Sequence, residues 1–292
     1  MCTIVLTPCF PLYSAAAGAD LLNDDFFFTQ KFKIKSRAAD GVTWTSEGEL
    51  SQKGAMGRLT AAYKHPSGVS LDKLQLKTDG RVLVEASMAL DDSLRFTVAA
   101  EDGRQEPGKP QHSYGRLGME LQKPYASANV ELDIVNGPAL KAAAVLARGS
   151  TFVGGELNYN THLEERERKP EFIDYNLGAG YRGLDWEASV STTDKLGAVH
   201  VHYIQRVTPD VDVGAAFKYK FNEDMQQLTV GCAYRPDAHT TFKAKFNTNA
   251  LLSMSFSQKI SKFVRLTLAG EADTQEWAAD SHKFGLGLTL FD

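Results

Sequence analysis

Apolar and polar residues alternate along most of this 292-residue chain, from about residue 26 to the end. The stretch from Thr241 to Asn247 is typical: Phe242, Ala244 and Phe246 take every second position, with polar residues between them. Successive side chains of a β-strand point to opposite faces, so this period of two predicts strands with one apolar and one polar face. No helical period interrupts the run, which excludes an α/β fold and predicts an all-β protein.

Short turns separate the alternating segments. About nineteen segments can be counted, which leaves about 14 residues for each strand and its turn. This length suits strands of about ten residues that cross a membrane at a tilt. Such a meander must close into a 19-stranded barrel, because open edges would leave backbone groups unpaired in lipid, and the odd count pairs the first and last strands in parallel. Dipeptides that favour tight hairpins mark the turns: Asp40-Gly41, Lys53-Gly54, Ser67-Gly68, Asp79-Gly80, Asp102-Gly103, Asn136-Gly137 and Arg148-Gly149.

Composition does not decide between a membrane barrel and a soluble all-β protein. With 43% hydrophobic residues and a mean hydropathy of −0.28, the chain has no run near the ~18 apolar residues of a membrane helix. A barrel gives such totals because only every second strand residue is apolar. The alternative from another class is therefore a soluble lipid-binding or structural protein, which would stay in solution without detergent.

Charge and cysteine content narrow the partners and the compartment. The net charge of −4 and the lack of a basic stripe with aromatic residues argue against nucleic acid as a partner. Cys2, Cys9 and Cys232 have no disulfide-framework spacing. The N-terminal region lacks the basic start of a signal peptide, since the first Lys or Arg is Lys31, so we expect no cleaved signal.

Residues 1–26 differ from the rest and are predicted to form an N-terminal segment ahead of a barrel that spans residues 27–292. Residues 13–24 are rich in helix formers, with Ser14 as a candidate cap. The apolar stripe of this helix is too short for stability in isolation, so the helix should lie against another part of the chain. Asp20, Asp24 and Asp25 make its C-terminal end acidic.

Motifs that suggest chemistry have simpler structural explanations. His200 and His202 share one strand face, but no third ligand is spaced to complete a metal site, so we expect lumen-lining imidazoles and no metal. Gly178-x-Gly180 and Gly285-x-Gly287 lie within strands without a following helix, and we expect these glycines to relieve crowding. No nucleophile and base, and no pair of carboxylates, stands out. We therefore predict neither an enzyme nor a cofactor.

Cationic residues recur on the polar face of several strands. If the apolar face meets lipid, they must line a water-filled lumen, because a lysine in mid-bilayer costs ~2–4 kcal/mol. Cations on a pore wall raise the local anion concentration, unless they sit at the rims and steer nothing. The predicted pore-lining residues are Lys31, Lys33, Lys35, Lys218, Lys220, Lys243, Lys245 and Arg265, with Asp20, Asp24 and Asp25 from the helix.

The closing region resembles a known family. Tyr234, Asp237, Ala238 and Thr240, followed by Ala244-Lys245-Phe246-Asn247, are similar to the signature of the eukaryotic mitochondrial porins, the voltage-dependent anion channels, and Gly285-Leu-Gly-Leu288 is similar to their closing strand. The resemblance implies a 19-stranded barrel of the mitochondrial outer membrane with its N-terminal helix inside the pore. It also implies voltage-gated diffusion of ATP, ADP, phosphate, organic anions and small ions. The partners that the resemblance implies are the lipid bilayer and these permeating molecules. It leaves open a homo-oligomer, or other mitochondrial membrane proteins, as further partners.

The resemblance carries over to the site with two departures. The family's pore helix bears basic residues, but Ala15, Gly18 and Asn23 take those places here, so an acidic helix in a basic barrel should weaken anion preference. The protein-import pore of the same membrane is the alternative within this class; the closing signature favours the metabolite channel. The family's nucleotide contacts would fall on Leu251, Leu252, Ser253, Ala269, Gly270, Glu271, Ala272 and Asp273, and the membrane-facing acidic residue of some members aligns near the neutral Leu74.

Overall fold

The computed structural model describes residues 21–51, 54–103, 113–135, 138–161, 170–223, 225–275 and 282–292. Among these residues the regular elements of strand type are β1 (Gln30–Arg37), β2 (Thr43–Ser51), β3 (Gly54–Lys64), β4 (Val69–Lys77), β5 (Val82–Asp91), β6 (Leu94–Asp102), β7 (Tyr114–Lys123), β8 (Ala126–Asp133), β9 (Ala139–Arg148), β10 (Thr151–Asn160), β11 (Glu171–Arg182), β12 (Trp186–Thr193), β13 (Ala198–Thr208), β14 (Val211–Lys220), β15 (Met225–Asp237), β16 (Thr240–Asn247), β17 (Leu251–Lys259), β18 (Val264–Asp273) and β19 (Lys283–Phe291).

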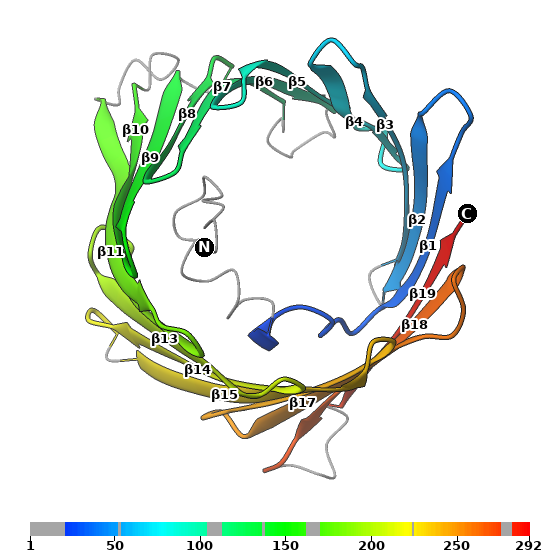
Figure 1. The fold of residues 1–292 in the computed structure, drawn as a ribbon, viewed down its shortest axis with the longest axis vertical. Helices are drawn as coiled ribbons and strands as arrows, with labels where there is room; N and C mark the ends of the chain where they lie inside the picture. The colour runs from blue at the N-terminus through cyan, green and yellow to red at the C-terminus, as the bar shows by residue number, and fades with distance from the viewer. Residues whose placement is uncertain are drawn as a thin grey trace.

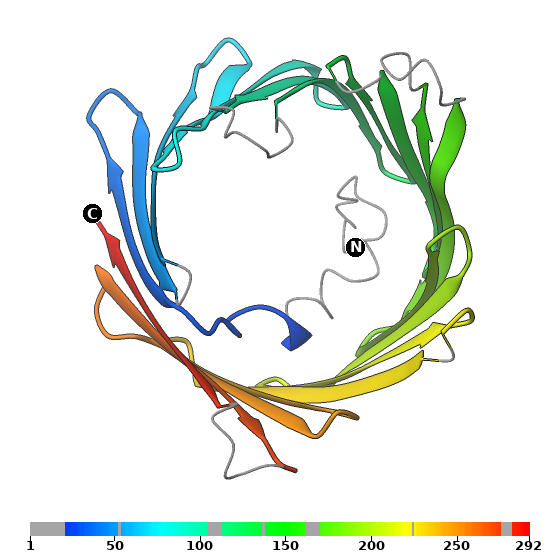
Figure 2. The same cartoon turned by 180° about the vertical axis from the view of Figure 1, so that it is seen from behind.

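The strands close into one ring, seen from its two ends in Figures 1 and 2. Each strand pairs with the next in the antiparallel sense, and β1 closes the ring by pairing in parallel with β19, where Phe32 lies opposite Leu288. The prediction of an all-β, 19-stranded barrel is therefore confirmed, including its parallel seam. Closure leaves no open sheet edge, which a barrel in lipid requires because backbone groups there find no water.

Glycines in left-handed conformations form many of the turns. Gly41, Gly54, Gly68, Gly80 and Gly149 have positive φ angles, between 60° and 130°. Residues with a Cβ rarely adopt this conformation, which is why the pattern of dipeptides identified these hairpins. Of the two remaining dipeptides, Gly103 lacks the positive φ, and residues 136–137 lie outside the described residues. The β12–β13 turn instead uses a left-handed run, Asp194, Lys195 and Leu196, that no dipeptide indicated.

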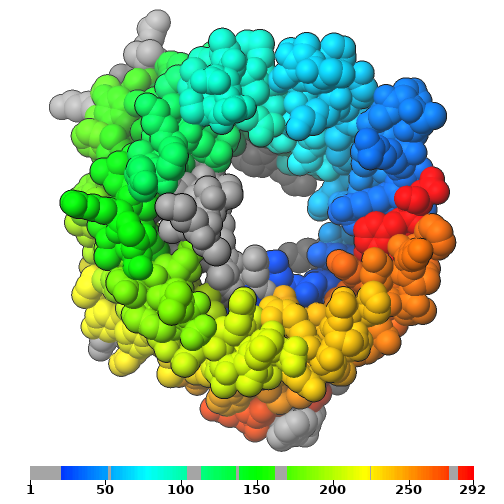
Figure 3. Space-filling view, in the orientation of Figure 1, coloured from blue at the N-terminus to red at the C-terminus, as the bar shows by residue number. Residues whose placement is uncertain are grey.

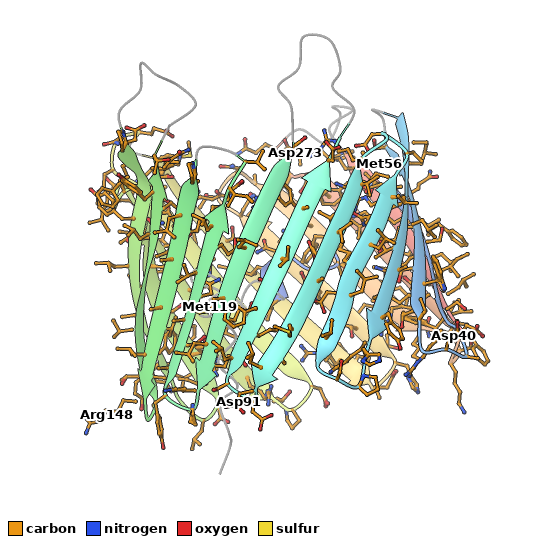
Figure 4. The ribbon with its side chains drawn as sticks, turned by 90° about the horizontal axis from the view of Figure 1, so that it is seen from above. Asp40, Met56, Asp91, Met119, Arg148 and Asp273 are labelled. Carbon is orange, nitrogen blue, oxygen red and sulfur yellow. The ribbon has the colours of Figure 1, made fainter. Side chains whose placement is uncertain are left out.

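The wall carries apolar side chains on its outer face and polar side chains on its inner face, which is the reverse of the arrangement in a soluble protein. On β11, Tyr175 and Leu177 are 41% and 60% exposed, whereas Asn176 between them is buried at 6%. Figure 4 shows side chains projecting from the outside of the wall, with Met119 between the two rims. Met56 and Asp273 mark one rim, and Asp40, Asp91 and Arg148 mark the other (Figure 4). An apolar exterior and a polar interior suit a wall whose outer solvent is lipid.

The interior of the ring is hollow, and Figure 3 shows an opening through it. Among the described residues, no helix has the length and apolar character needed to cross a membrane. The predicted N-terminal helix falls mostly on residues 1–20, which lie outside the described residues. Leu21 and Leu22, the first residues described, are helical and lie within the ring.

Candidate functional site

Residues 21–28, which we call the docked segment, lie against the inner wall of the barrel (Figure 1, dark blue). Leu21 and Leu22 are each 5% exposed and form an apolar cluster with Ala233 of β15, against which Ala216 of β14 packs. Burial of a leucine side chain contributes about 2 kcal/mol. Asp25 then adopts a left-handed conformation, with φ of 69°, as residues beyond a helix C-terminus often do.

Glycines of the wall make room for this segment. A Cβ atom on Gly231 would lie 2.6 Å from Leu22 Cδ2, and one on Gly214 would lie 3.2 Å from Leu21 Cδ2. On β19, a Cβ on Gly285 would lie 2.0 Å from the Phe27 carbonyl oxygen. The expectation that the Gly285-x-Gly287 pair relieves crowding is confirmed, and the crowding comes from the docked segment.

Two lysines of β16 hold the segment by its polar groups. Lys245 Nζ donates a hydrogen bond to the Leu22 carbonyl oxygen at 2.8 Å and lies 4.4 Å from the centre of the Phe26 ring. Lys243 Nζ donates to the Asp24 carbonyl oxygen at 3.2 Å and pairs with Asp25 Oδ2 at 3.1 Å. Carbonyl groups at a helix C-terminus carry partial negative charge, so ammonium groups stabilise this end of the segment.

A recess of about 250 Å³ lies between the docked segment and the wall. Its lining includes Leu22, His200, His202, Lys218 and Lys245. The two imidazole rings are nearly parallel, with centroids 6.4 Å apart, and the His200 ring nitrogen Nε2 lies 3.2 Å from a threonine hydroxyl on β12. In the part of the chain that the structure describes, no group of three or more His, Cys, Asp or Glu residues is placed to hold a metal ion.

Opposite charges alternate on the wall near the seam. Lys31 of β1 pairs with Glu49 of β2 at 3.8 Å, and Lys33 forms an ion pair with Glu47 on the same two strands. Arg58 of β3 also lies 3.8 Å from Glu49. The cations in this part of the lumen are therefore largely balanced by carboxylates, which reduces the field that they impose on a passing ion.

The sequence profile of the eukaryotic porins matches residues 9–285. The chain belongs to the eukaryotic porin family. The predicted family membership is therefore confirmed.

Curated relatives cover almost the whole of this porin. Mitochondrial outer membrane protein porin 4 of Arabidopsis thaliana is 24% identical over 271 residues, which is 93% of each chain. The non-selective voltage-gated ion channel VDAC3 of Rattus norvegicus is 25% identical over 283 residues, 94% of this chain and 95% of the relative. The voltage-dependent anion-selective channel of Drosophila melanogaster is 25% identical over 272 residues, 89% and 90% of the two chains.

The charged residues predicted to line the pore of this porin divide into two groups by their contacts. Lys243 and Lys245 bind the docked segment, to which Asp25 and the Asp24 carbonyl belong. These charged groups are therefore partly occupied by one another and are not all free to meet the water of the lumen. Asp20 lies outside the described residues. Contact of any of these residues with a permeating ion stays a prediction. The others lie on β1 (Lys31, Lys33, Lys35), β14 (Lys218, Lys220) and β18 (Arg265). Of these, Lys31 also contacts the docked segment, because its Nζ lies 5.0 Å from the centre of the Phe27 ring.

The residues predicted to contact nucleotides divide between the two faces of β17 and β18. The inner face carries Ser253, which is hydrogen-bonded to Glu271 at 3.2 Å, and both line the recess beside Leu22. The register puts Leu251 and Ala269 on this face as well, with Asp273. Leu252, Gly270 and Ala272 alternate with them and face outward, so a nucleotide in the lumen would meet only the inner set. Nucleotide contact by that inner set stays a prediction.

Sequence reasoning missed two features of this lumen. One is the role of Lys243 and Lys245 as anchors, which depends on where the segment crosses β16. The other is the set of wall carboxylates, Glu47 and Glu49 near the seam and further ones on β8, β10 and β11. Their signal was present in the sequence, because they occupy the same alternating polar positions as the lysines.

Proposed function

We propose that this porin is a voltage-gated diffusion channel of the mitochondrial outer membrane. It passes small ions and metabolites, namely ATP and ADP, phosphate and organic anions, without a chemical step. The observation that carries the proposal is a closed barrel with an open, charged lumen in a member of the eukaryotic porin family. Relatives named as mitochondrial outer membrane porins and voltage-gated channels support the location and the gating.

Permeation follows from the width and field of the lumen. Anions are attracted where cations on the wall lack a partner, and carboxylates such as Glu47 and Glu49 reduce this attraction. The named relatives include both a non-selective and an anion-selective channel. Paired charges near the seam, together with Lys243 and Lys245 occupied by the docked segment, favour weak selectivity for this porin.

The proposal divides the chain into a pore element, residues 1–26, and a barrel, residues 27–292. Nucleotides would contact the inner wall at Leu251, Ser253, Ala269, Glu271 and Asp273 on their way through. Self-association and contacts with other mitochondrial membrane proteins complete the proposed partners. The protein-import pore is disfavoured, since the relatives named above are porins and ion channels.

Recording from the refolded protein in a planar bilayer tests this function. In a KCl gradient we expect a large conductance that closes at either polarity and a reversal potential close to zero. A strong preference for chloride would keep the channel but contradict the argument from paired charges. Absence of conductance from protein that is well folded by circular dichroism would contradict the channel function itself.

A further inference from the structure

The His200 and His202 imidazoles of β13 lie where the docked segment meets the wall, and passive diffusion through the lumen gives them no role. Both rings line the recess of about 250 Å³ between the segment and the wall, beside Leu22. His202 lies directly opposite Ala216 of β14, which packs against the apolar cluster that Leu22 forms with Leu21. The two rings therefore border the surface on which the segment rests.

The surroundings of His202 suit a neutral ring. Its Nδ1 atom is buried without a hydrogen bond, and the hydroxyl of Ser189, directly opposite on β12, does not bond to it. A neutral imidazole can leave one nitrogen as a bare acceptor, whereas a protonated imidazole carries an N–H on both nitrogens. A charged donor buried without an acceptor is costly, because it loses its hydration and gains no hydrogen bond.

The cations around the recess also oppose a proton on either ring. Lys218 of β14 lies directly opposite His200, and Lys245 of β16 lines the same recess. The described residues of the docked segment that reach the lining are Leu22 and Asn23, and neither carries a charge. Two imidazolium groups would therefore join two ammonium groups in one small volume.

The carboxylates nearby compensate for little of this charge. Glu271 of β18 lines the recess but is already paired with Lys283 at 2.8 Å. Glu187 of β12 forms an ion pair with an arginine of β11 at 2.6 Å. Asp194, directly after β12, acts electrostatically on His200 and attracts a proton to it. Among the described residues that face the two rings, positive charge would therefore exceed negative charge once the imidazoles were protonated.

We propose that His200 and His202 form a proton-operated latch for the docked segment. Neutral rings let the segment lie over the recess. Protonated rings release it, because undocking opens the recess to the water of the lumen, which solvates the added charge.

The sign of the pH dependence follows from this difference in solvation. Since the undocked form takes up protons more readily, acid shifts the equilibrium toward it. Imidazoles in water take up a proton at about pH 6.5, so docking should be firmest above this pH and should weaken as the pH falls below it.

Maleimide labelling of Leu21→Cys in the refolded full chain, with Cys2, Cys9 and Cys232 replaced by serine, tests the latch. Leu21 is 5% exposed, so this thiol should react only while the segment is undocked. Thiol reactivity itself falls in acid, so the rate is divided by that of Leu184→Cys, at a fully exposed turn position. We expect this ratio to be about ten times larger at pH 5.5 than at pH 7.5, the factor for one imidazole that is protonated only in the undocked form.

Neutral replacements of the two histidines should remove the acid effect. His202→Gln keeps a polar side chain without a titrating ring and should remove most of it; His202→Asn serves the same purpose if the glutamine variant does not fold. The double variant His200→Gln, His202→Gln should give the same ratio at both pH values. His65→Gln is the matched control, because His65 lies in the β3–β4 turn outside the recess, where its ring bonds to Ser67. This control should keep the full acid effect.

Three results would overturn the latch. The first is an equal ratio at the two pH values in the protein with both histidines. The second is an acid effect that persists in the double variant, which would assign it to a carboxylate such as Asp25. The third is an acid effect that His65→Gln removes as fully as His202→Gln does. The assay needs no conductance, so each of these results would leave the proposed channel function intact.

Discussion

Lys245 should determine how firmly the docked segment is held, and removal of its ammonium group tests this directly. In Lys245→Met the alkyl chain keeps its length while the hydrogen bond to the Leu22 carbonyl, 2.8 Å long, is lost. A hydrogen bond to a charged group contributes ~1.5–3 kcal/mol. The contact with the Phe26 ring, at 4.4 Å, adds ~0.5–1 kcal/mol.

The cost of burying the ammonium group offsets part of this gain. A net loss of about 2 kcal/mol in docking free energy is therefore expected, which corresponds to about a 30-fold larger undocked population. A thiol at residue 21 reports that population, because Leu21 is buried only while the segment is docked. The assay is the rate of maleimide labelling of Leu21→Cys, after Cys2, Cys9 and Cys232 have been replaced by serine.

Lys218→Met is the control for loss of lumen charge. Lys218 lines the same recess as Lys245 but has no hydrogen bond or ion pair with the docked segment. We expect labelling about 30 times faster in Lys245→Met and nearly unchanged in Lys218→Met. Equal labelling rates in the two variants would refute the anchoring role and show that the apolar contacts of Leu21 and Leu22 hold the segment without help.

Three further variants test other parts of the wall. Gly285→Ala places a Cβ 2.0 Å from the Phe27 carbonyl oxygen and should also accelerate labelling of the Leu21→Cys thiol, whereas Gly270→Ala, where the nearest atom is 3.9 Å away, should not. Lys33→Gln should move the reversal potential in a KCl gradient toward the potassium equilibrium potential, because it leaves Glu47 without its ion-pair partner. Glu47→Gln should move the reversal potential toward the chloride equilibrium potential. Shifts of the same sign would contradict the pairing. Val98→Lys, on the outer face of β6, should lower the free energy of unfolding in lipid by ~2–4 kcal/mol. Thr97→Lys, on the inner face, should change this free energy by less than about 1 kcal/mol. Urea titrations measure both, and equal losses would show that the faces are misassigned.

The alternation of residues was enough to predict the barrel because the pattern reflects its two solvents. Phe242 and Phe246 face lipid and Lys243 and Lys245 face the interior, so each strand carries its own orientation. Glycine dipeptides such as Asp40-Gly41 added the hairpins, since positive φ is a local preference. The strand count then fixed the parallel pairing of β1 with β19, because parity leaves no other closure.

The contents of the lumen could not be predicted in the same way. Lys31, Lys33, Lys243 and Lys245 look alike in the sequence, as polar-face lysines on alternating strands. Two of them pair with carboxylates of the adjacent strand β2, and two hold the docked segment. What distinguishes them is the path of residues 21–28 across β14–β19, and that path depends on contacts between residues more than 200 positions apart.

The sequence by itself therefore determined the architecture of this porin: strands, turns, the closed ring, and which residues face lipid. These are consequences of local periodicity and of the unfavourable energy of unpaired backbone in a membrane. Only the tertiary structure decided which wall charges are balanced and where glycines admit the segment. Those properties arise when the sheet curves and brings side chains together across the strands and the lumen, which no single strand encodes.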